Sequence, residues 1–349
     1  MGNIICQNVD VCMCRVRVPS DAILPIRIQY ICKGYDYIFR SWLQLKSHVK
    51  AGMPPRRTRK RSSRNPPQPG PETCSPFAAK KGQTRQSKSC LPPDVLKRMA
   101  GAGGGIRGGY AAINNTGDLK KQLAAQLGCA ADDERCILEK SMLSHKEKKV
   151  LLETFFRPEM PEGWKKDPDM WLNSDDIAKV MKQYEKAYAP EFRFLGVVPS
   201  DFSSPDPYEK GSKRCMNDQF CHINLEEEKA KGRRILGAVF NLDPHDKSGS
   251  HWVAFAVDLK RRCTYYFDSY GMAPPPQVAR LMRHLTLQDP GLRLQQNGRR
   301  FQYSDTECGM YSMYFIIRML AGETFKKFCR NPIADKYMLQ FRKVLFDAE

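Results

Sequence analysis

The spacing of apolar residues predicts helices in the chain after residue 110. In three successive stretches the apolar residues recur three or four positions apart, as on one face of an amphipathic helix. These stretches are 118–127, 133–143 and 146–155. We therefore expect a helical subdomain over 110–165. Asn173 then has the side chain of an N-cap, and two aspartates follow it in the first turn of a further helix expected over 174–187.

Past Pro190 the pattern changes to short runs of β-branched and aromatic residues separated by turn residues, which is typical of strands. The runs cover 192–198, 234–242, 251–258 and 264–268. A strongly apolar stretch over 308–320 then predicts a buried helix, and a last helix is expected over 335–345. Strands followed by helices indicate an α+β domain over 166–349.

The first 109 residues show neither pattern. Residues 1–50 mix cysteines with apolar and basic residues, have no clear period, and stay unassigned. From 51 to 109 the chain is rich in Pro, Ser, Arg and Lys and ends in a run of glycines. Because this composition cannot bury enough apolar surface to offset chain ordering, we expect a disordered basic linker.

The net charge of +19 is concentrated in this linker. Residues 51–110 carry about 13 Lys or Arg against two acidic residues, a balance that favours polyanions. The partner expected on this basis is nucleic acid, bound through the basic residues of 56–98. A basic tail that only keeps the chain soluble is the alternative.

Composition also excludes several classes of protein. No run approaches the roughly 20 apolar residues that cross a bilayer, and the N-terminus lacks the layout of a secretory signal. The 13 cysteines lack the spacing of a disulfide framework, so we expect reduced thiols and a location in the cytosol, the nucleus or a particle assembled there. The spacing of Cys215, Cys221 and His222 does not fit zinc, so we expect surface thiols there and no metal.

Cys308 is the candidate nucleophile. A cysteine attacks as its thiolate, which is favoured by a nearby imidazolium and by the positive end of a helix. Cys308 begins the apolar stretch 308–320 directly after a polar loop, and Gly309 beside it would let a substrate backbone approach closely. The alternative for any single thiol is a buried cysteine that packs as a small hydrophobic residue.

A histidine and an aspartate can supply the partners that this thiol needs. His251 begins one predicted strand and Asp268 ends the next. Antiparallel pairing across the short turn 260–263 would bring the two side chains together at one end of the sheet. Trp252, next to the histidine, is expected to pack in the core.

Four short motifs together resemble one protein family. They are Trp171-Leu-Asn, Ser250-His-Trp252, Phe267-Asp-Ser269 and Gln302-x5-Cys308-Gly309. Over residues 150–349 the chain is similar to the ubiquitin-like-protein (SUMO-type) proteases and the adenovirus-type cysteine proteases, and most like the versions carried by large cytoplasmic DNA viruses. The resemblance implies a central short mixed sheet packed against helices, with the cysteine at the N-terminus of a buried helix.

The resemblance also implies a role for each motif residue. Cys308 would attack the scissile carbonyl, His251 would exchange protons, and Asp268 would hold the imidazole. Gln302 would stabilise the oxyanion together with the backbone N–H of Cys308.

Two tryptophans and the glycine would form the substrate site. Trp252 would pack beside the catalytic imidazole, and Trp171 would cover the substrate channel, with Gly309 between substrate and helix. His245 lies six residues before the motif histidine and is not selected. The chemistry requires no cofactor, although the resemblance allows DNA as an activator.

Proteases of this family favour Gly-Gly before the cut, and the chain contains such a sequence itself. Residues 106–110 read Ile-Arg-Gly-Gly-Tyr. We expect self-cleavage between Gly109 and Tyr110, after the pair Gly108-Gly109, which would release the basic arm from the mature enzyme. A plain glycine linker is the alternative.

The expected function is a cysteine endopeptidase of virion and host cytoplasm or nucleus that cuts viral structural precursors at Gly-Gly during virion maturation. One alternative keeps the chemistry and changes the substrate to host proteins that carry ubiquitin or SUMO. A second alternative is a nucleic-acid-binding scaffold on an inactive protease fold.

Overall fold

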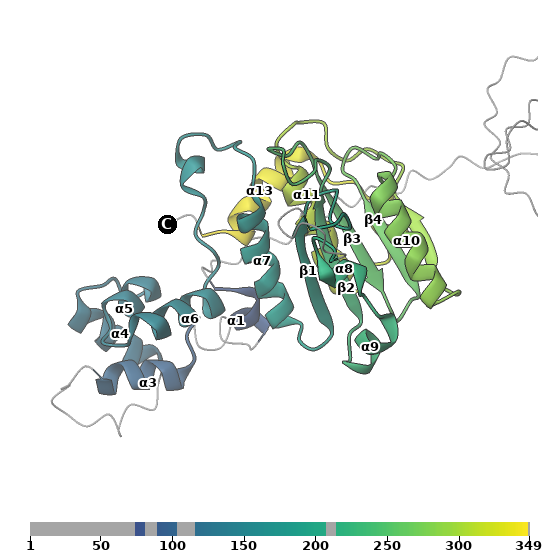
Figure 1. The fold of residues 1–349 in the computed structure, drawn as a ribbon. Helices are drawn as coiled ribbons and strands as arrows, with labels where there is room; N and C mark the ends of the chain where they lie inside the picture. Colours follow the sequence, from purple (N-terminus) through teal and green to yellow (C-terminus); the bar gives the residue numbers. More distant parts are fainter. Residues whose placement is uncertain (1–73, 81–88, 103–115, 207–213, 348–349) are drawn as a thin grey trace, which may run out of the picture. The chain divides into compact units, whose positions relative to one another are not determined.

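A five-stranded mixed β-sheet lies at the centre of the computed structural model, which describes residues 74–80, 89–102, 116–206 and 214–347 (Figure 1). The strands are β1 (Phe192–Val198), β2 (Ile235–Asn241), β3 (Trp252–Asp258), β4 (Cys263–Phe267) and β5 (Arg293–Gln296). They lie side by side in sequence order. The central pairs are antiparallel, whereas β1 and β5 each run parallel to their neighbour. The α+β class and the mixed sheet are confirmed.

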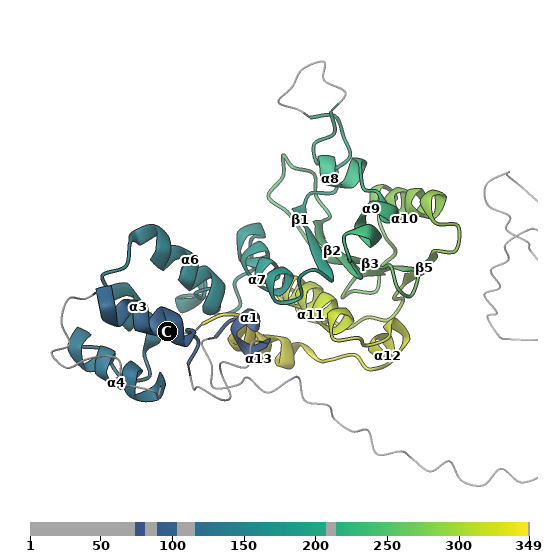
Figure 2. The ribbon, with the colours of Figure 1, turned by 90° about the horizontal axis from the view of Figure 1, so that it is seen from below.

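Helices cover both faces of this sheet (Figure 2). One face carries α7 (Ser174–Ala187), α11 (Cys308–Leu320), α12 (Phe325–Arg330) and α13 (Asp335–Leu345). The other carries α8 (Asp218–Cys221), α9 (Leu225–Ala230) and α10 (Pro276–Gln288). Because β3 is covered on both faces, all seven of its residues are buried, which explains its unbroken apolar sequence.

Most predicted elements of the α+β domain are confirmed. Helix α7 has its expected N-cap, where the Asn173 side chain accepts from the Asp176 N–H at 2.9 Å and the Asp176 carboxylate accepts from the Asn173 N–H at 3.1 Å. Strand β5 was not predicted. Its sequence, Arg-Leu-Gln-Gln, is mostly exposed at the sheet edge and has no apolar alternation, so only its pairing with β4 makes it a strand.

Five helices form a separate helical subdomain with its own apolar core. They are α1 (Pro76–Lys80), α3 (Pro93–Ala102), α4 (Thr116–Leu127), α5 (Glu134–Lys140) and α6 (His145–Phe155). The predicted helices 118–127, 133–143 and 146–155 correspond to the last three of these. Phe156 closes this core, whereas Trp164 packs against Phe346 of the α+β domain at 5.1 Å. The boundary therefore lies before Trp164 and not at residue 165.

The prediction of a disordered linker over 51–109 is wrong for residues 74–80 and 89–102, which contain α1 and α3. Leu91, Val95 and Leu96 are buried against the other helices of the subdomain. This short apolar face is hidden when composition is averaged over the basic segment, and a helix of ten residues is stable only through such packing. The remaining linker residues and the unassigned segment 1–50 lie outside the described residues.

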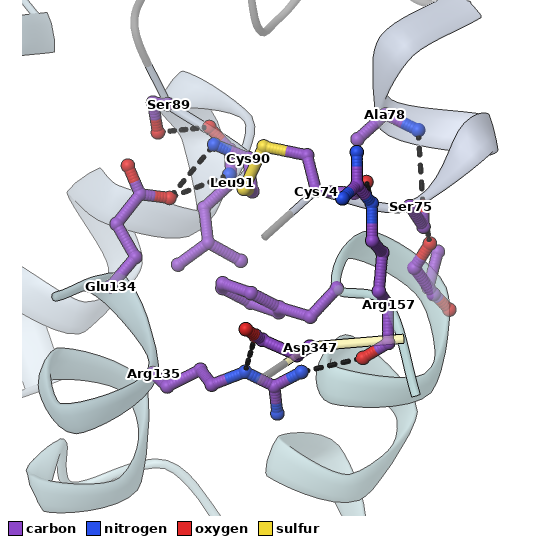
Figure 3. The surroundings of a disulfide bond; sticks show 12 residues. Cys74, Ser75, Ala78, Ser89, Cys90, Leu91, Glu134, Arg135, Arg157 and Asp347 are labelled. Carbon is purple, nitrogen blue, oxygen red and sulfur yellow. Dashed lines mark hydrogen bonds and ion pairs between the residues drawn. A yellow bond between two sulfur atoms is a disulfide. The ribbon is translucent and has the colours of Figure 1, made fainter. Parts of the chain in front are cut away.

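The prediction of reduced thiols is wrong for six cysteines, which form three disulfides. The pairs are Cys74–Cys90, Cys129–Cys136 and Cys215–Cys221. The last pair also replaces the surface thiols expected near His222. Folding brings the paired Cα atoms to 5.1–6.4 Å, a proximity that spacing along the chain does not reveal. Figure 3 shows the first bond, which joins the start of α1 to the segment before α3.

Within the described ranges, no helix is both long and apolar enough to span a membrane. The same residues contain no cluster of three or more His, Cys, Asp or Glu side chains suited to a metal ion.

Candidate active site

Cys308 is the first residue of α11 and is almost completely buried. Eleven of the 13 residues of α11 are buried, and the helix runs between the sheet and the outer helices, so its N-terminus is fixed by packing. The first N–H groups of a helix have no acceptor within the helix, and together with the helix dipole they favour negative charge. The thiol of Cys308 therefore lies where a thiolate is stabilised.

His251 and Asp268 meet at one end of the β3–β4 hairpin. The register in which Ala254 pairs with Phe267, continued by three residues, sets His251 opposite Tyr270 and makes Asp268 its diagonal neighbour on the same face. Arg262, with φ of 51°, allows the tight turn at the other end. The imidazole Nε2 of His251 lies 2.7 Å from Oδ1 of Asp268, and both side chains are buried.

The imidazole is held in its protonated form by two partners. Burial lowers the pKa of His251, but the hydrogen bond with Asp268 and the hydrogen bond and charge of Cys308 outweigh it and raise the pKa to about 9. With Nε2 bonded to Asp268, Nδ1 is the nitrogen that remains for the thiol. The structure thus brings Cys308, His251 and Asp268 into one chain of contacts, which can activate a thiol for nucleophilic attack.

Two residues that sequence reasoning missed hold this arrangement in place. Tyr270 stacks on the imidazole of His251 at 4.6 Å, and its backbone N–H donates to Oδ1 of Asp268 at 2.8 Å. The Asn297 side chain accepts from the N–H of Asp268 at 2.9 Å and donates to its carbonyl at 2.7 Å. Asn297 lies 29 positions from its partner, so no local pattern pointed to it.

Gln302 is fully buried, and its amide has a fixed orientation. The Ser269 hydroxyl donates to Oε1 at 2.7 Å, and Nε2 donates to the Ser304 carbonyl at 2.8 Å. Among the described residues the second N–H of the amide has no hydrogen-bond acceptor, which agrees with the oxyanion role that the family motif implies for Gln302.

The two motif tryptophans line a groove of about 480 Å³. The groove is also bordered by the end of β1 and by parts of the loop 241–249. Trp252 is buried and donates from Nε1 to the Leu172 carbonyl at 3.0 Å, whereas Trp171 is 41% exposed. The residues that line the groove include neither Cys308 nor His251, so the roles of the two tryptophans toward a substrate stay predictions.

Gly309 was expected to face the substrate, but it is not among the residues that line the groove. A methyl group at this position would lie 3.2–3.4 Å from Leu172, Trp252 and Ile177, so the glycine lets α11 pack closely against these residues. The expectation that it provides room for a substrate backbone is corrected to this packing role. His245 bonds to Asp201 at 2.7 Å and lines the groove, apart from the chain of contacts at Cys308. Gly108, Gly109 and Tyr110 lie outside the described residues.

Comparison with known proteins places the chain in a family of thiol peptidases. Residues 235–348 match the C-terminal catalytic domain of the Ulp1 protease family. The chain is 30% identical over 239 residues to a thiol protease of Acanthamoeba polyphaga mimivirus, across 65% of this chain and 74% of that protein. It is 37% identical over 118 residues to the SUMO-1 cysteine protease of African swine fever virus, across 32% of this chain and 43% of that protein.

A solved structure shares the fold. The crystal structure of the African swine fever virus protease aligns with a TM-score of 0.55 and 22% identity, across 81% of this chain and 98% of that one. The chain thus belongs to the Ulp1 protease family. It is a cysteine-type peptidase that acts on polypeptides, and its relatives named above are viral proteins.

Proposed function

We propose that Cys308 is the nucleophile of an endopeptidase that cuts after Gly-Gly in viral structural precursors, with His251 and Asp268 as its partners. The chain of contacts from the helix N-terminus through a protonated imidazole to a buried carboxylate carries this proposal. The same observations favour an active enzyme over the inactive scaffold. Virion and host cytoplasm or nucleus are the places where such precursors would be met.

The proposed reaction runs through a thioester. The Cys308 thiolate attacks the scissile carbonyl carbon, and the oxyanion accepts hydrogen bonds from the Cys308 N–H and the second N–H of Gln302. His251 gives its proton to the leaving amine as the C–N bond breaks. Water then attacks the thioester, His251 takes a proton from it, and the acid product leaves with the thiolate restored.

The groove supports a preference for glycine. Trp252 is held by its bond to the Leu172 carbonyl, and Trp171 lines the same groove. Bulky indole rings beside the reacting bond would leave little room for a substrate side chain, which favours glycine next to the cut. A peptide that ends in Ile-Arg-Gly-Gly before a fluorescent leaving group should therefore be cut at least tenfold faster than its Gly-Ala counterpart. Equal rates for the two peptides would contradict the preference.

A preference for cutting after Gly-Gly also allows a second function, the removal of a ubiquitin-like modifier from host proteins. It is favoured by the name of the African swine fever virus relative, a SUMO-1 cysteine protease. Reporters that carry ubiquitin or SUMO, compared with the free Ile-Arg-Gly-Gly peptide, separate the two. A kcat/KM for a modifier reporter that exceeds the peptide value about a hundredfold would favour the second function, because a folded modifier adds binding surface.

We also propose self-cleavage after Gly109, but with a changed consequence. Helix α3 precedes Gly109 and α4 follows it, and both bury apolar residues in the core of the helical subdomain. The two pieces should therefore stay together after the cut. We expect wild-type protein to give two bands in denaturing gels and one peak in native size exclusion, while the Cys308→Ala variant remains whole. A wild-type chain that stays intact on prolonged incubation contradicts self-cleavage.

Nucleic acid is proposed as an activator bound by the basic residues of 56–98. In the described part of this segment Lys97 and Arg98 are exposed, and Arg98 is paired with Glu147 at 2.5 Å. Phosphate contacts release counterions, so DNA should stimulate peptide cleavage at low salt and lose its effect as salt rises. No stimulation at low ionic strength would remove DNA from the proposal.

Activity should have an alkaline limb near pH 9. The pKa of His251 is raised to about 9 from an ordinary value near 6.5, so its proton is present at neutral pH and is lost as pH rises through 9. The stability that the folded state gains from this raised pKa is complete below pH 6.5 and is lost as the pH rises from 6.5 through 9. Asp268→Asn should move the limb of kcat/KM to lower pH. A wild-type limb below pH 7.5 would contradict this assignment.

Gln302→Ala should lower kcat by about a hundredfold or more, because it removes one oxyanion donor. Ser269→Ala keeps the amide but removes the hydroxyl that orients it, so a smaller loss is expected. Steady-state kinetics on one peptide measure both, and KM should change little. An unchanged kcat in Gln302→Ala would exclude the glutamine from the oxyanion site.

A further inference from the structure

A buried ion pair lies directly behind the nucleophile. Glu307 is the residue before Cys308 and is fully buried at the N-cap of α11. Its carboxylate accepts from Arg342 of α13, with Nη2 at 2.5 Å from Oε1 and Nε at 3.2 Å from Oε2. Both side chains are at most 5% exposed. The reaction described above uses neither group.

The same guanidinium also holds the wall of the substrate groove. Nη1 of Arg342 donates to the carbonyls of Pro168 at 2.8 Å and Met170 at 3.0 Å, and Cζ of Arg342 lies 4.2 Å from the centroid of the Trp164 ring. The segment that it bonds leads directly into Trp171, which lines the groove. One side chain thus connects the residue before the nucleophile with the chain before the covering tryptophan.

Stability alone does not account for a pair of this kind. Removing two charges from water costs about as much as their attraction returns, and apolar residues of similar size often serve equally well. Burial raises the pKa of Glu307 even though Arg342 opposes the shift, which reflects this cost. Apolar side chains cannot replace directional hydrogen bonds. The forked guanidinium of Arg342 fixes the positions of one carboxylate and two carbonyls at once.

We propose that Glu307 and Arg342 are positioning residues, which set the alignment of Cys308 and of the groove wall relative to each other. This inference rests on the proposed role of Cys308 as nucleophile. The pair acts at the N-terminus of α11, where a small rotation would move the thiol relative to the imidazole of His251. Misplacement of a reacting group by about an ångström can cost a hundredfold in rate.

Helix α13 carries Arg342 in its last turn, and contacts with the helical subdomain fix the chain at and directly after that turn. Nε of Arg135 donates to Asp347 at 2.7 Å, and Nη2 donates to the Arg157 carbonyl at 2.5 Å, as Figure 3 shows. Arg157 in turn donates to the carbonyls of Lys343 and Cys74, each at 3.2 Å. The end of α13 is therefore anchored, so that the position of Arg342 is well defined.

The test separates positioning from folding by removing both charges together. Glu307→Gln alone leaves the Arg342 charge buried without its partner and should lower the melting temperature. The double variant Glu307→Gln/Arg342→Met should recover most of that loss. If the pair positions the thiol, the double variant should still show kcat about tenfold or more below wild type and Cys308 alkylation by iodoacetamide slowed to a similar degree.

The other end of α11 offers a matched control. Arg318 of α11 pairs with Glu323, which follows the helix, at 2.8 Å, and the double variant Arg318→Met/Glu323→Gln likewise removes one arginine and one glutamate charge. It should alkylate Cys308 at the wild-type rate, measured by mass spectrometry of the peptide that contains it. If the Glu307/Arg342 double variant had wild-type kcat and a wild-type rate of Cys308 alkylation, the positioning role would be overturned. An active Cys308→Ala enzyme would instead overturn the proposed function.

Discussion

Cys308→Ala is expected to reduce kcat/KM for the Ile-Arg-Gly-Gly peptide by about four to six orders of magnitude, because no other group can form the thioester. The fold should survive, since the thiol occupies a small buried site at a helix N-terminus and alanine suits a helix. Continuous fluorescence on the purified protein, with circular dichroism to check folding, measures both.

Cys329 provides the control for this variant. It is a second free cysteine, and burial raises the pKa of its thiol to about 11, so it stays protonated and unreactive at neutral pH. Cys329→Ala should keep wild-type activity. Activity retained in Cys308→Ala and lost in Cys329→Ala would show that the nucleophile has been assigned to the wrong residue.

His251→Ala should lower kcat by about four orders of magnitude, because the thiolate loses its counter-charge and the leaving amine loses its proton donor. The variant leaves Asp268 buried without its partner, so a lower melting temperature is also expected. Rates measured at a temperature well below that melting point distinguish lost chemistry from lost folding.

An exposed histidine serves as the comparison. His284 lies on the outer side of α10, and His284→Ala should change neither rate nor stability. If His251→Ala kept more than about a tenth of the wild-type rate, another base would have to be sought. His245, whose pKa is raised by its hydrogen bond with Asp201, would be the next residue to test.

Together these residues describe a peptidase whose chemistry depends on contacts between distant parts of the chain. The imidazole of His251 is held by a hairpin, the thiol of Cys308 by a buried helix, and the amide of Gln302 by its bonds to Ser269 and Ser304. Removal of one member should therefore alter the others, and losses from combined variants should not add.

The sequence predicted the elements whose signals are local. Helix α7 could be placed to the residue because its N-cap and apolar period lie within one short stretch, and α11 could be placed because its sequence is strongly apolar. The motif residues could be assigned because the family pattern fixes their types and intervals. The pairing of His251 with Asp268 followed from two strands joined by a short turn, a local feature as well.

Elements with weak local signals were missed. Helix α3 lies in a basic, proline-rich segment, and β5 is short, polar and exposed. Each is stabilised by a surface that the rest of the chain supplies, the core of the helical subdomain for α3 and the edge of β4 for β5. The three disulfides were missed for the same reason, since only folding brings their cysteines within bonding distance.

The sequence by itself determined the α+β class and the family, and it predicted a nucleophile with its histidine, aspartate and glutamine. Only the tertiary structure decided how these groups are held: Asn297 on Asp268, Tyr270 on His251, and Arg342 on Glu307. These supports join residues as much as 35 positions apart. The catalytic residues of the family have fixed types and intervals, so they leave a pattern in the sequence. The residues that hold them in position need only meet them in the folded structure, so they leave no such pattern.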